Sequence, residues 1–239
     1  MTTATHAAPV IEKHTIGYVP PEDRHGRSRD LFTLWFGGNI APLPIVTGAV
    51  GVHIYNLSLF WVVAAILVGH AIGGVVMALA SAQGPRVGVP QMIQSRAQFG
   101  SRGSLLVTVI ACLMYVAFFA SNIVLAGQSF NGIVPSVSVP VGIIFGAVGS
   151  GVIVMIGYRF IHYLNRIATW VMGLSILAGF MYIVTHVTST DFLSRGEFTV
   201  SGWLSMVSIA ALWQIAFAPY VSDYSRYLPE NTTMKSTFW

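Results

Sequence analysis

Acidic residues are absent from the long middle part of this chain, because no Asp or Glu occurs between residues 31 and 190. Charged residues make up only 8% of the sequence, against about 25% in an average soluble domain. The only cysteine, Cys112, lies in an apolar run, which excludes a disulfide framework and a thiolate metal site. The apolar runs also lack paired carboxylates, a Cys/His cluster and a glycine-rich phosphate loop, so we expect no enzyme and no cofactor.

Hydrophobic residues, in contrast, make up 54% of the chain and occur in long runs. A membrane-spanning helix needs about 20 mainly apolar residues, and six stretches come close to this length or exceed it. They are residues 31–52, 57–80, 105–130, 141–158, 167–187 and 203–221. We therefore predict an all-α transmembrane protein of about six helices, with a tail at 1–30, a membrane domain at 31–221 and a terminal segment at 222–239.

Lys and Arg lie almost entirely on one side of these predicted spans. Eleven of the twelve fall in the tail, in the second and fourth connections and in the terminal segment, and only Arg195 falls on the other side. Because Lys and Arg concentrate on the cytoplasmic side of membrane proteins, we predict a multi-pass protein of the cell (inner) membrane with both termini in the cytoplasm. Basic residues distributed in this way form no single patch, so we expect no nucleic-acid partner despite the net charge of +4.

Two polar regions flank the first two spans. The first 30 residues lack the apolar core and cleavage site of a secretory signal, and we interpret them as a flexible, uncleaved tail. The connection at 84–100 has apolar residues at helical spacing, which predicts a short interfacial helix.

The first apolar stretch carries Gly37, Gly38, Pro42 and Pro44 at its middle, where a helix should break. Each proline lacks an amide hydrogen and clashes with the preceding turn, so nearby carbonyl groups lose their partners within the helix. A bilayer tolerates such backbone only where protein covers it or where it lines a polar cavity. Two interpretations stay open: a proline kink satisfied by packing or water, and a half-site for an ion or substrate.

Small and polar residues within the spans have simpler interpretations. Gly69 and Gly73 in the second span, and Gly142 and Gly146 in the fourth, have the spacing that lets helices approach closely, so we assign them to packing. His70 is ionisable within a span, which is a functional hypothesis by default. The alternative is a neutral imidazole hydrogen-bonded to a neighbouring helix.

Aromatic rings and amides are the remaining functional groups of the spans. Phe118 and Asn122 are four residues apart and share a helix face, and Trp213 is adjacent to Gln214. Rings stack on the faces of a flat heterocycle, and Asn or Gln offers paired donor and acceptor to its edge. Such a combination is suggestive of a site for a neutral planar solute, although each residue alone is compatible with packing.

Three runs of sequence carry a resemblance to a known family. They are residues 34–43 (LWFGGNIAPL), 84–100 (GPRVGVPQMIQSRAQFG) and 213–229 (WQIAFAPYVSDYSRYLP). The chain resembles the purine–cytosine permease family, the nucleobase:cation symporters that also include allantoin and hydantoin carriers. That resemblance implies a LeuT-type fold of two inverted five-helix repeats, in which the first and sixth helices are broken; this chain would hold the first repeat and the first helix of the second.

The resemblance also implies roles for individual residues. Phe118 stands where relatives often have a tryptophan that stacks on the nucleobase, and Asn122 where some have a glutamine. The implied substrate-binding residues are Phe118, Asn122, Trp213, Gln214, Gly38 and Asn39. The backbone carbonyls of Gly37 and Ile40 match half of a cation site, whose other half belongs to an eighth span that this chain does not contain. Asp223 and Arg226 can pair on a helical turn and would brace a cytoplasmic gate.

The function implied is cation-coupled symport of cytosine, a purine, allantoin or a related heterocycle, with Na⁺ or H⁺ as the coupling ion. The chain ends where a seventh span would begin, so a partial transporter is expected, with a complementary C-terminal half as a partner. The alternative is a truncated membrane fragment that does not transport.

Overall fold

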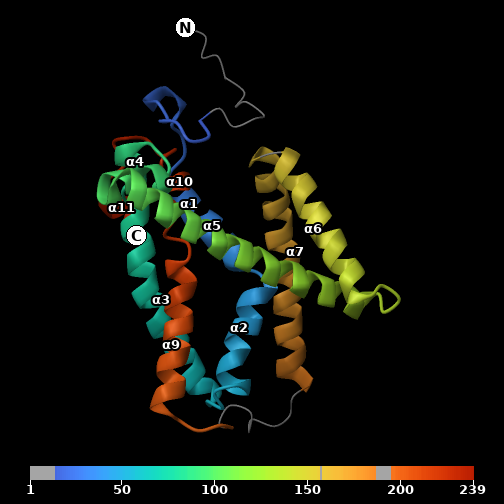
Figure 1. The fold of residues 1–239 in the computed structure, drawn as a ribbon. Helices are drawn as coiled ribbons and strands as arrows, with labels where there is room; N and C mark the ends of the chain where they lie inside the picture. Colours follow the sequence, from blue (N-terminus) through green and yellow to red (C-terminus); the bar gives the residue numbers. More distant parts are fainter. Residues whose placement is uncertain (1–13, 157, 187–194) are drawn as a thin grey trace.

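Helices form all the regular secondary structure in the residues that the computed structural model describes, which are 14–156, 158–186 and 195–239. Figure 1 shows their arrangement. In chain order they are the 3-10 helix η1 Pro21–Asp23 and the α-helices α1 Ser28–Asn39, α2 Pro42–His53, α3 Leu59–Ser81, α4 Gly84–Val87, α5 Gln91–Ile133, α6 Val139–Ile156, α7 Tyr158–His186, α9 Val200–Ile215, α10 Val221–Ser225 and α11 Met234–Phe238.

Four of these helices, α3, α5, α6 and α7, are long and apolar enough to cross a membrane, and α1 with α2 forms a fifth candidate as a bent pair. The prediction of an all-α transmembrane protein is therefore confirmed. The prediction of six similar spans needs correction at the sixth. Helix α9 has 16 residues, which at 1.5 Å per residue is about 24 Å and falls short of a hydrocarbon core of about 30 Å.

The predicted break in the first span is present. Helix α1 ends at Asn39 and α2 begins at Pro42, and the two are bent by 62°. Pro42 occupies the first position of α2, where its missing N–H costs nothing. Pro42 and Pro44 cannot donate to the carbonyls four residues before them, which belong to Gly38 and Ile40.

A second break follows α9. The helix ends at Ile215, residues 216–220 form turns, and the chain resumes as the short helix α10. Pro219 lies within these turns and cannot continue a helical hydrogen-bond ladder. Within the predicted span at 203–221, the continuous helix thus ends at Ile215.

Glycine with a positive φ shapes the connection between α3 and α5. Gly88 (φ +66°) ends α4, and Gly100 (φ +67°) interrupts α5 with non-helical dihedral angles. Only glycine adopts this region without strain. The helix predicted at 84–100 is therefore divided into α4 and the first part of α5, which turns at Gly100 into the span.

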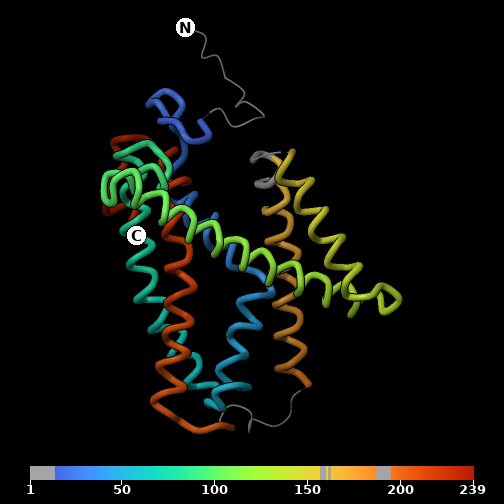
Figure 2. Tube along the Cα trace, viewed as in Figure 1, coloured from blue at the N-terminus to red at the C-terminus, as the bar shows by residue number. Residues whose placement is uncertain are grey.

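The helices form two groups that α5 connects. Figures 1 and 2 show α3 and α9 side by side, with α6 and α7 together on the other side and α5 running between the groups. Helices α3 and α9 make the most extensive contact, α5 packs on α6, and α1 packs on α7. Buried Leu57, Val62, Ala65 and Met206 form the hydrophobic core between α3 and α9.

Close backbone approach holds α3 against α9. A Cβ added at Gly69 would overlap the Val207 carbonyl oxygen, and one at Gly73 would overlap that of Ala211. Between α5 and α6, a Cβ on Gly142 would lie 2.9 Å from the Gly127 Cα. The predicted packing role is confirmed at these three glycines.

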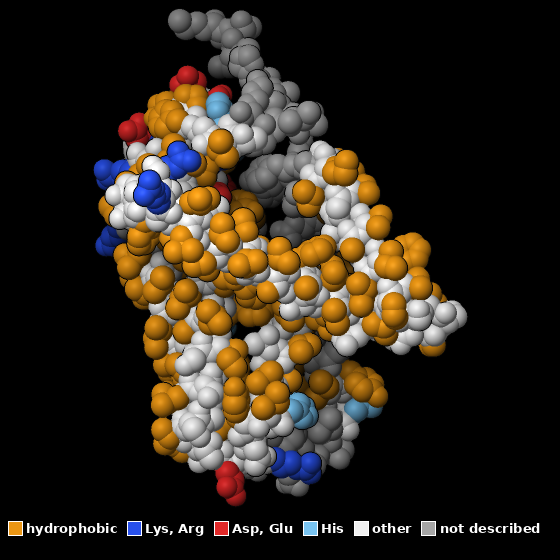
Figure 3. Space-filling view, viewed as in Figure 1, with side chains coloured by type: hydrophobic (Ala, Val, Ile, Leu, Met, Phe, Trp, Pro, Cys, Tyr) orange, Lys and Arg blue, Asp and Glu red, His pale blue; other side chains and the backbone are white. Residues whose placement is uncertain are grey.

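Hydrophobic side chains cover most of the face shown in Figure 3, while Lys and Arg gather mainly near one end of the molecule. Helices α6 and α7 carry many of the exposed apolar side chains, including Phe145, Trp170 and Leu174. An exposed apolar surface of this extent is compatible with lipid contact.

Specific contacts attach residues 14–27 of the predicted flexible tail (the N-terminal segment) to the rest of the protein, and residues 1–13 of that tail lie outside the described residues. Val19 is fully buried, and its N–H donates to the Gly88 carbonyl at 2.8 Å. The His25 N–H donates to the Tyr227 carbonyl at 2.6 Å. The segment therefore contacts both the α4–α5 connection and the chain after α10.

Two buried arginines anchor this segment. Arg24 donates from Nε to the Val19 carbonyl (2.9 Å) and from Nη1 to the Pro85 carbonyl (2.6 Å). Arg226 donates to the backbone carbonyls of His14 (2.9 Å), Thr15 (3.2 Å) and Gly17 (3.0 Å). A short-range sequence pattern does not reveal these bonds, since Arg226 and its partners are separated by about 210 residues.

Replacing Gly73 by valine should lower the free energy of unfolding by about 1–3 kcal/mol, because the added methyl groups must displace α9 from α3. Circular dichroism of the purified protein during heating measures the loss. Gly74→Val is the matched control, since it adds the same side chain to the same helix at a site with nothing within 4 Å. An equal loss in both variants would contradict the packing role of Gly73.

Arg226→Gln should release the N-terminal segment, because hydrogen bonds from a charged donor contribute about 1.5–3 kcal/mol. Hydrogen exchange followed by mass spectrometry should show faster exchange of amides in 14–25, including the Val19 N–H, by about tenfold or more. Arg29→Gln removes the same charge from an exposed side chain and should leave this exchange unchanged. Unchanged exchange in Arg226→Gln would show that Arg226 does not hold the segment.

Candidate functional site

A cavity of about 230 Å³ lies where the two helix breaks meet α5. The break between α1 and α2, one face of α5, and the end of α9 with the following turn each supply part of its wall. The lining residues are Gly38, Ala41, Leu43, Pro44, Tyr115, Phe118, Asn122, Trp213, Ala216, Phe217 and Tyr220.

Aromatic rings form most of this wall. The rings of Phe118 and Trp213 meet edge to face, with centroids 6.0 Å apart and planes at 90°. Tyr115 and Tyr220 make a second perpendicular pair at 5.3 Å. Perpendicular pairs leave ring faces available to a third flat group, which an offset stack between the same rings would cover.

Asn122 is the amide side chain that α5 contributes to the cavity. It is exposed, and one N–H of its amide donates to the Phe118 carbonyl at 2.8 Å, one turn earlier. An amide has a second N–H and an acceptor oxygen. The second N–H and the oxygen of the Asn122 amide can therefore bond the edge of a heterocycle.

Four of the predicted substrate-binding residues, Gly38, Phe118, Asn122 and Trp213, are brought together in this cavity. The lining found among the described residues does not include the other two, Asn39 and Gln214. Adjacent residues on a helix point about 100° apart, so Gln214 cannot share the direction of Trp213. Its amide Nε2 instead lies 3.2 Å from Nδ1 of His70 on α3.

His70 accepts this hydrogen bond, because an amide nitrogen can only donate. A ring nitrogen that accepts is unprotonated, which matches the neutral, helix-bridging imidazole considered as the alternative for His70. The contact adds a polar link to the glycine-rich interface between α3 and α9.

Asn39 uses its amide to connect segments that are distant in sequence. Its Nδ2 donates to the Trp35 carbonyl at 2.7 Å, and its Oδ1 accepts from Nε1 of Trp213 at 2.9 Å. Asn39 is the last residue of α1, and Trp213 lies in the last turn of α9. The hydrogen bond thus joins the ends of the two broken helices.

Three aromatic residues of the cavity, Tyr115, Phe217 and Tyr220, were missed by sequence reasoning. Tyr115 precedes Phe118 by three residues and Asn122 by seven, so helical spacing alone places it on their face. Phe217 and Tyr220 follow the end of α9, where no helical period applies. Their positions depend on the turn that contains Pro219.

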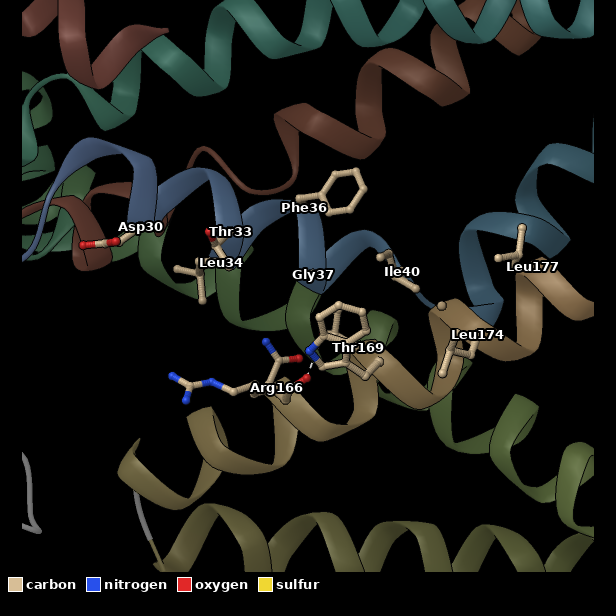
Figure 4. Close-up of a pocket in the computed structure, with 13 residues that line it drawn as sticks. Asp30, Thr33, Leu34, Phe36, Gly37, Ile40, Arg166, Thr169, Leu174 and Leu177 are labelled. Atoms are coloured by element: carbon tan, nitrogen blue, oxygen red, sulfur yellow. Dashed lines mark hydrogen bonds between the residues drawn. The ribbon is translucent and has the colours of Figure 1, made fainter.

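The residues predicted to offer carbonyls to a cation line a separate crevice between α1 and α7. This crevice has a volume of about 670 Å³ and includes Gly37, Ile40 and Thr169. Figure 4 shows Asp30 and Arg166 toward one end and Leu174 and Leu177 toward the other. The Gly37 carbonyl accepts the Ile40 N–H at 3.1 Å, so one of its two lone pairs is already used.

The predicted direct pairing of Asp223 with Arg226 is wrong. Within residues 14–156, 158–186 and 195–239, the two side chains form no ion pair. The Asp223 carboxylate instead accepts the Gln91 N–H at 2.6 Å and so caps α5, while Arg226 binds the N-terminal segment. Burial raises the pKa of the Asp223 carboxyl, and the Gln91 N–H and the Arg226 charge oppose this rise.

Neighbouring contacts reinforce the cap on α5. Ser222 donates to Oε1 of Gln91 and accepts from Nε2 of Gln94 at 2.9 Å. The helix α10 that follows the second break is therefore bound to the first turn of α5 by the side chains of Ser222 and Asp223. No group of three or more His, Cys, Asp or Glu suited to a metal occurs in the part of the chain that the structure describes.

Comparison with known proteins identifies relatives that match most of the chain. Similar proteins include "Putative purine-cytosine permease YxlA" of Bacillus subtilis, 41% identical over 229 residues, or 96% of this chain and 50% of the relative. In Saccharomyces cerevisiae, purine-cytosine permease FCY22 is 28% identical over 87% of this chain and 40% of its own. Vitamin B6 transporter TPN1 of the same yeast is 24% identical over 93% of this chain and 40% of its own length. No solved structure matches the chain.

This chain spans half the length of its bacterial relative and less of the yeast proteins. All three relatives are named as permeases or transporters, and none as an enzyme. A family model described as "Permease for cytosine/purines, uracil, thiamine, allantoin" matches residues 18–239, which confirms the resemblance predicted from the three sequence runs. With its apolar helices, the chain is a multi-pass membrane protein, and it belongs to this family of permeases for cytosine, purines, uracil, thiamine and allantoin.

Proposed function

We propose that this protein acts in secondary transport of a nucleobase or related planar heterocycle, such as cytosine, a purine or allantoin, across the plasma membrane. The observation that carries the proposal is the cavity at the two helix breaks, which combines perpendicular aromatic rings with the Asn122 amide. Membership of the permease family supports the same class of solute.

Recognition at this cavity needs no charged side chain. Stacking of a base on an aromatic ring contributes about 1–3 kcal/mol in nucleic-acid binders, and Trp213 and Phe118 offer such surfaces. Asn122 supplies the hydrogen bonds that distinguish a heterocycle from an apolar ring. A neutral site is favoured here because a charge in the bilayer centre is costly.

The size of the cavity favours a small solute. Sites for drug-sized ligands measure about 300–1,000 Å³, and this cavity measures about 230 Å³. A single-ring or double-ring base matches that volume better than a nucleoside, which also carries a sugar.

Coupling to Na⁺ or H⁺ is the part of the proposal that depends on the α1–α2 break. In a continuous helix the carbonyls of Gly38 and Ile40 would accept hydrogen bonds from the N–H groups of residues 42 and 44. Both of these residues are prolines and have no N–H. Such carbonyls, with that of Gly37, suit a hard cation, which takes about six oxygen ligands.

Cells that lack their own nucleobase carriers and express the reading frame of this protein should accumulate labelled cytosine, a purine or allantoin in a saturable, ion-dependent way. Replacing Na⁺ with choline and collapsing the proton gradient in separate assays identifies the coupling ion. Absence of uptake for every heterocycle, with the protein present in the membrane, would refute the proposed transport.

Phe118→Ala and Asn122→Ala should each weaken heterocycle binding by about tenfold, because each removes one stacking or hydrogen-bonding group. Equilibrium binding of the labelled solute to purified membranes measures the change. Ser121→Ala is the control, since Ser121 precedes Asn122 on α5 and its hydroxyl bonds the Ala117 carbonyl. Affinity unchanged in both cavity variants would remove the cavity from the substrate site.

A further inference from the structure

Asn39 was expected to bind substrate, but its amide is engaged within the protein. It lies in the wall behind the cavity, with Oδ1 on the Trp213 indole N–H (2.9 Å) and Nδ2 on the Trp35 carbonyl (2.7 Å). Both ends of the side chain are therefore used to connect a backbone atom of α1 to a ring of α9.

The indole N–H is the only polar atom of the Trp213 side chain. Once Asn39 accepts this hydrogen, Trp213 presents a purely π surface to the cavity, and rotation of its ring would break the hydrogen bond. Phe118 contacts the same ring edge to face from α5. Asn39 and Phe118 together thus define the direction of the Trp213 face.

The position of Asn39 depends in turn on the break between α1 and α2. Its backbone carbonyl accepts the Ala41 N–H at 3.0 Å across that break. One turn earlier, the Trp35 ring packs against three rings around the second break. The ring centroids are 5.3 Å apart for Phe217, 5.8 Å for Tyr220 and 5.4 Å for Tyr224. The end of α1 is therefore held to the α9–α10 region by one hydrogen bond and an aromatic cluster.

We infer that Asn39 is a positioning residue, which holds the Trp213 ring at the substrate cavity and makes its orientation depend on the conformation of the α1–α2 break. The inference rests on the proposed function where it concerns the solute. Its structural part, the dependence of Trp213 on Asn39, stands on the two hydrogen bonds alone. A movement of α1 away from α9 would release the ring and weaken stacking on a planar solute.

Fluorine NMR of the purified chain labelled with 5-fluorotryptophan tests this dependence without substrate. The chain has six tryptophans, and Trp213→Phe identifies the Trp213 resonance by its loss. Asn39→Leu replaces the amide with an apolar side chain of similar size and so removes both hydrogen bonds. In this variant the Trp213 resonance should shift or broaden. A Trp213 resonance unchanged in Asn39→Leu would overturn the inference.

Asn39→Asp provides a test by partial rescue. The ionised carboxylate accepts from Trp213 but cannot donate to the Trp35 carbonyl, whereas the protonated acid can do both. The Trp213 resonance should therefore return toward the wild-type position as the pH falls through the range where a half-buried carboxyl protonates. A resonance in Asn39→Asp that stays displaced at every pH at which the protein remains folded would contradict the positioning role.

Gln214→Leu is the matched control, because it removes the amide next to Trp213 and its bond to His70 on the other side of α9. Its Trp213 resonance should stay near the wild-type position. An equal displacement in Gln214→Leu would show general loosening of α9 and would overturn the inference.

Binding of labelled cytosine, a purine or allantoin to the same samples connects the ring to the solute. Asn39→Leu should weaken binding by about tenfold, as expected for a lost hydrogen bond. Weaker binding with an unmoved Trp213 resonance would make Asn39 a direct ligand and overturn its positioning role. If the wild type binds none of these solutes, the proposed function fails, while the resonance still decides whether Asn39 positions Trp213.

Discussion

Backbone hydrogen bonding inside a membrane is the constraint on which the rest of this structure depends. A bilayer offers no water to the carbonyls left unpaired by Pro42 and Pro44, so other protein groups must surround them. The neighbours of this break are the aromatic residues after α9, the Asn39 amide and the face of α5 that carries Phe118. The cavity thus lies where the chain cannot form a continuous helix, and its rings shield the same backbone that gives it polarity.

Helix packing at a distance from the cavity fixes its geometry. Gly69 and Gly73 bring the backbone of α3 against that of α9, and this contact sets the height and rotation of Trp213. The Asp223 cap and the Ser222 bonds then fix the second break to the start of α5. Small residues between α3 and α9 and polar contacts between α10 and α5 therefore both help to place a few aromatic rings.

Features governed by local chemistry were predictable from the sequence. The break at Gly37–Pro44 follows from two prolines, the pairing of Phe118 with Asn122 follows from the helical period, and the glycine contacts follow from their spacing. Features that depend on distant partners were not. The hydrogen bond between Gln214 and His70 joins residues 144 positions apart, and that between Asn39 and Trp213 joins residues 174 positions apart. Arg226 bonds carbonyls about 210 residues away instead of nearby Asp223.

The attachment of the N-terminal segment by Arg226 has a consequence for sequence variation. Its guanidinium donates hydrogen bonds to the main-chain carbonyl oxygens of residues 14, 15 and 17, and every amino acid has such an oxygen. The side chains at positions 15 and 17 are thus free to diverge while the backbone path and the arginine are kept, whereas the His14 ring also bonds the Asp23 carboxylate at 2.7 Å. Poor similarity among related chains in this stretch would then indicate relaxed selection on side chains and would be no sign of a lost contact.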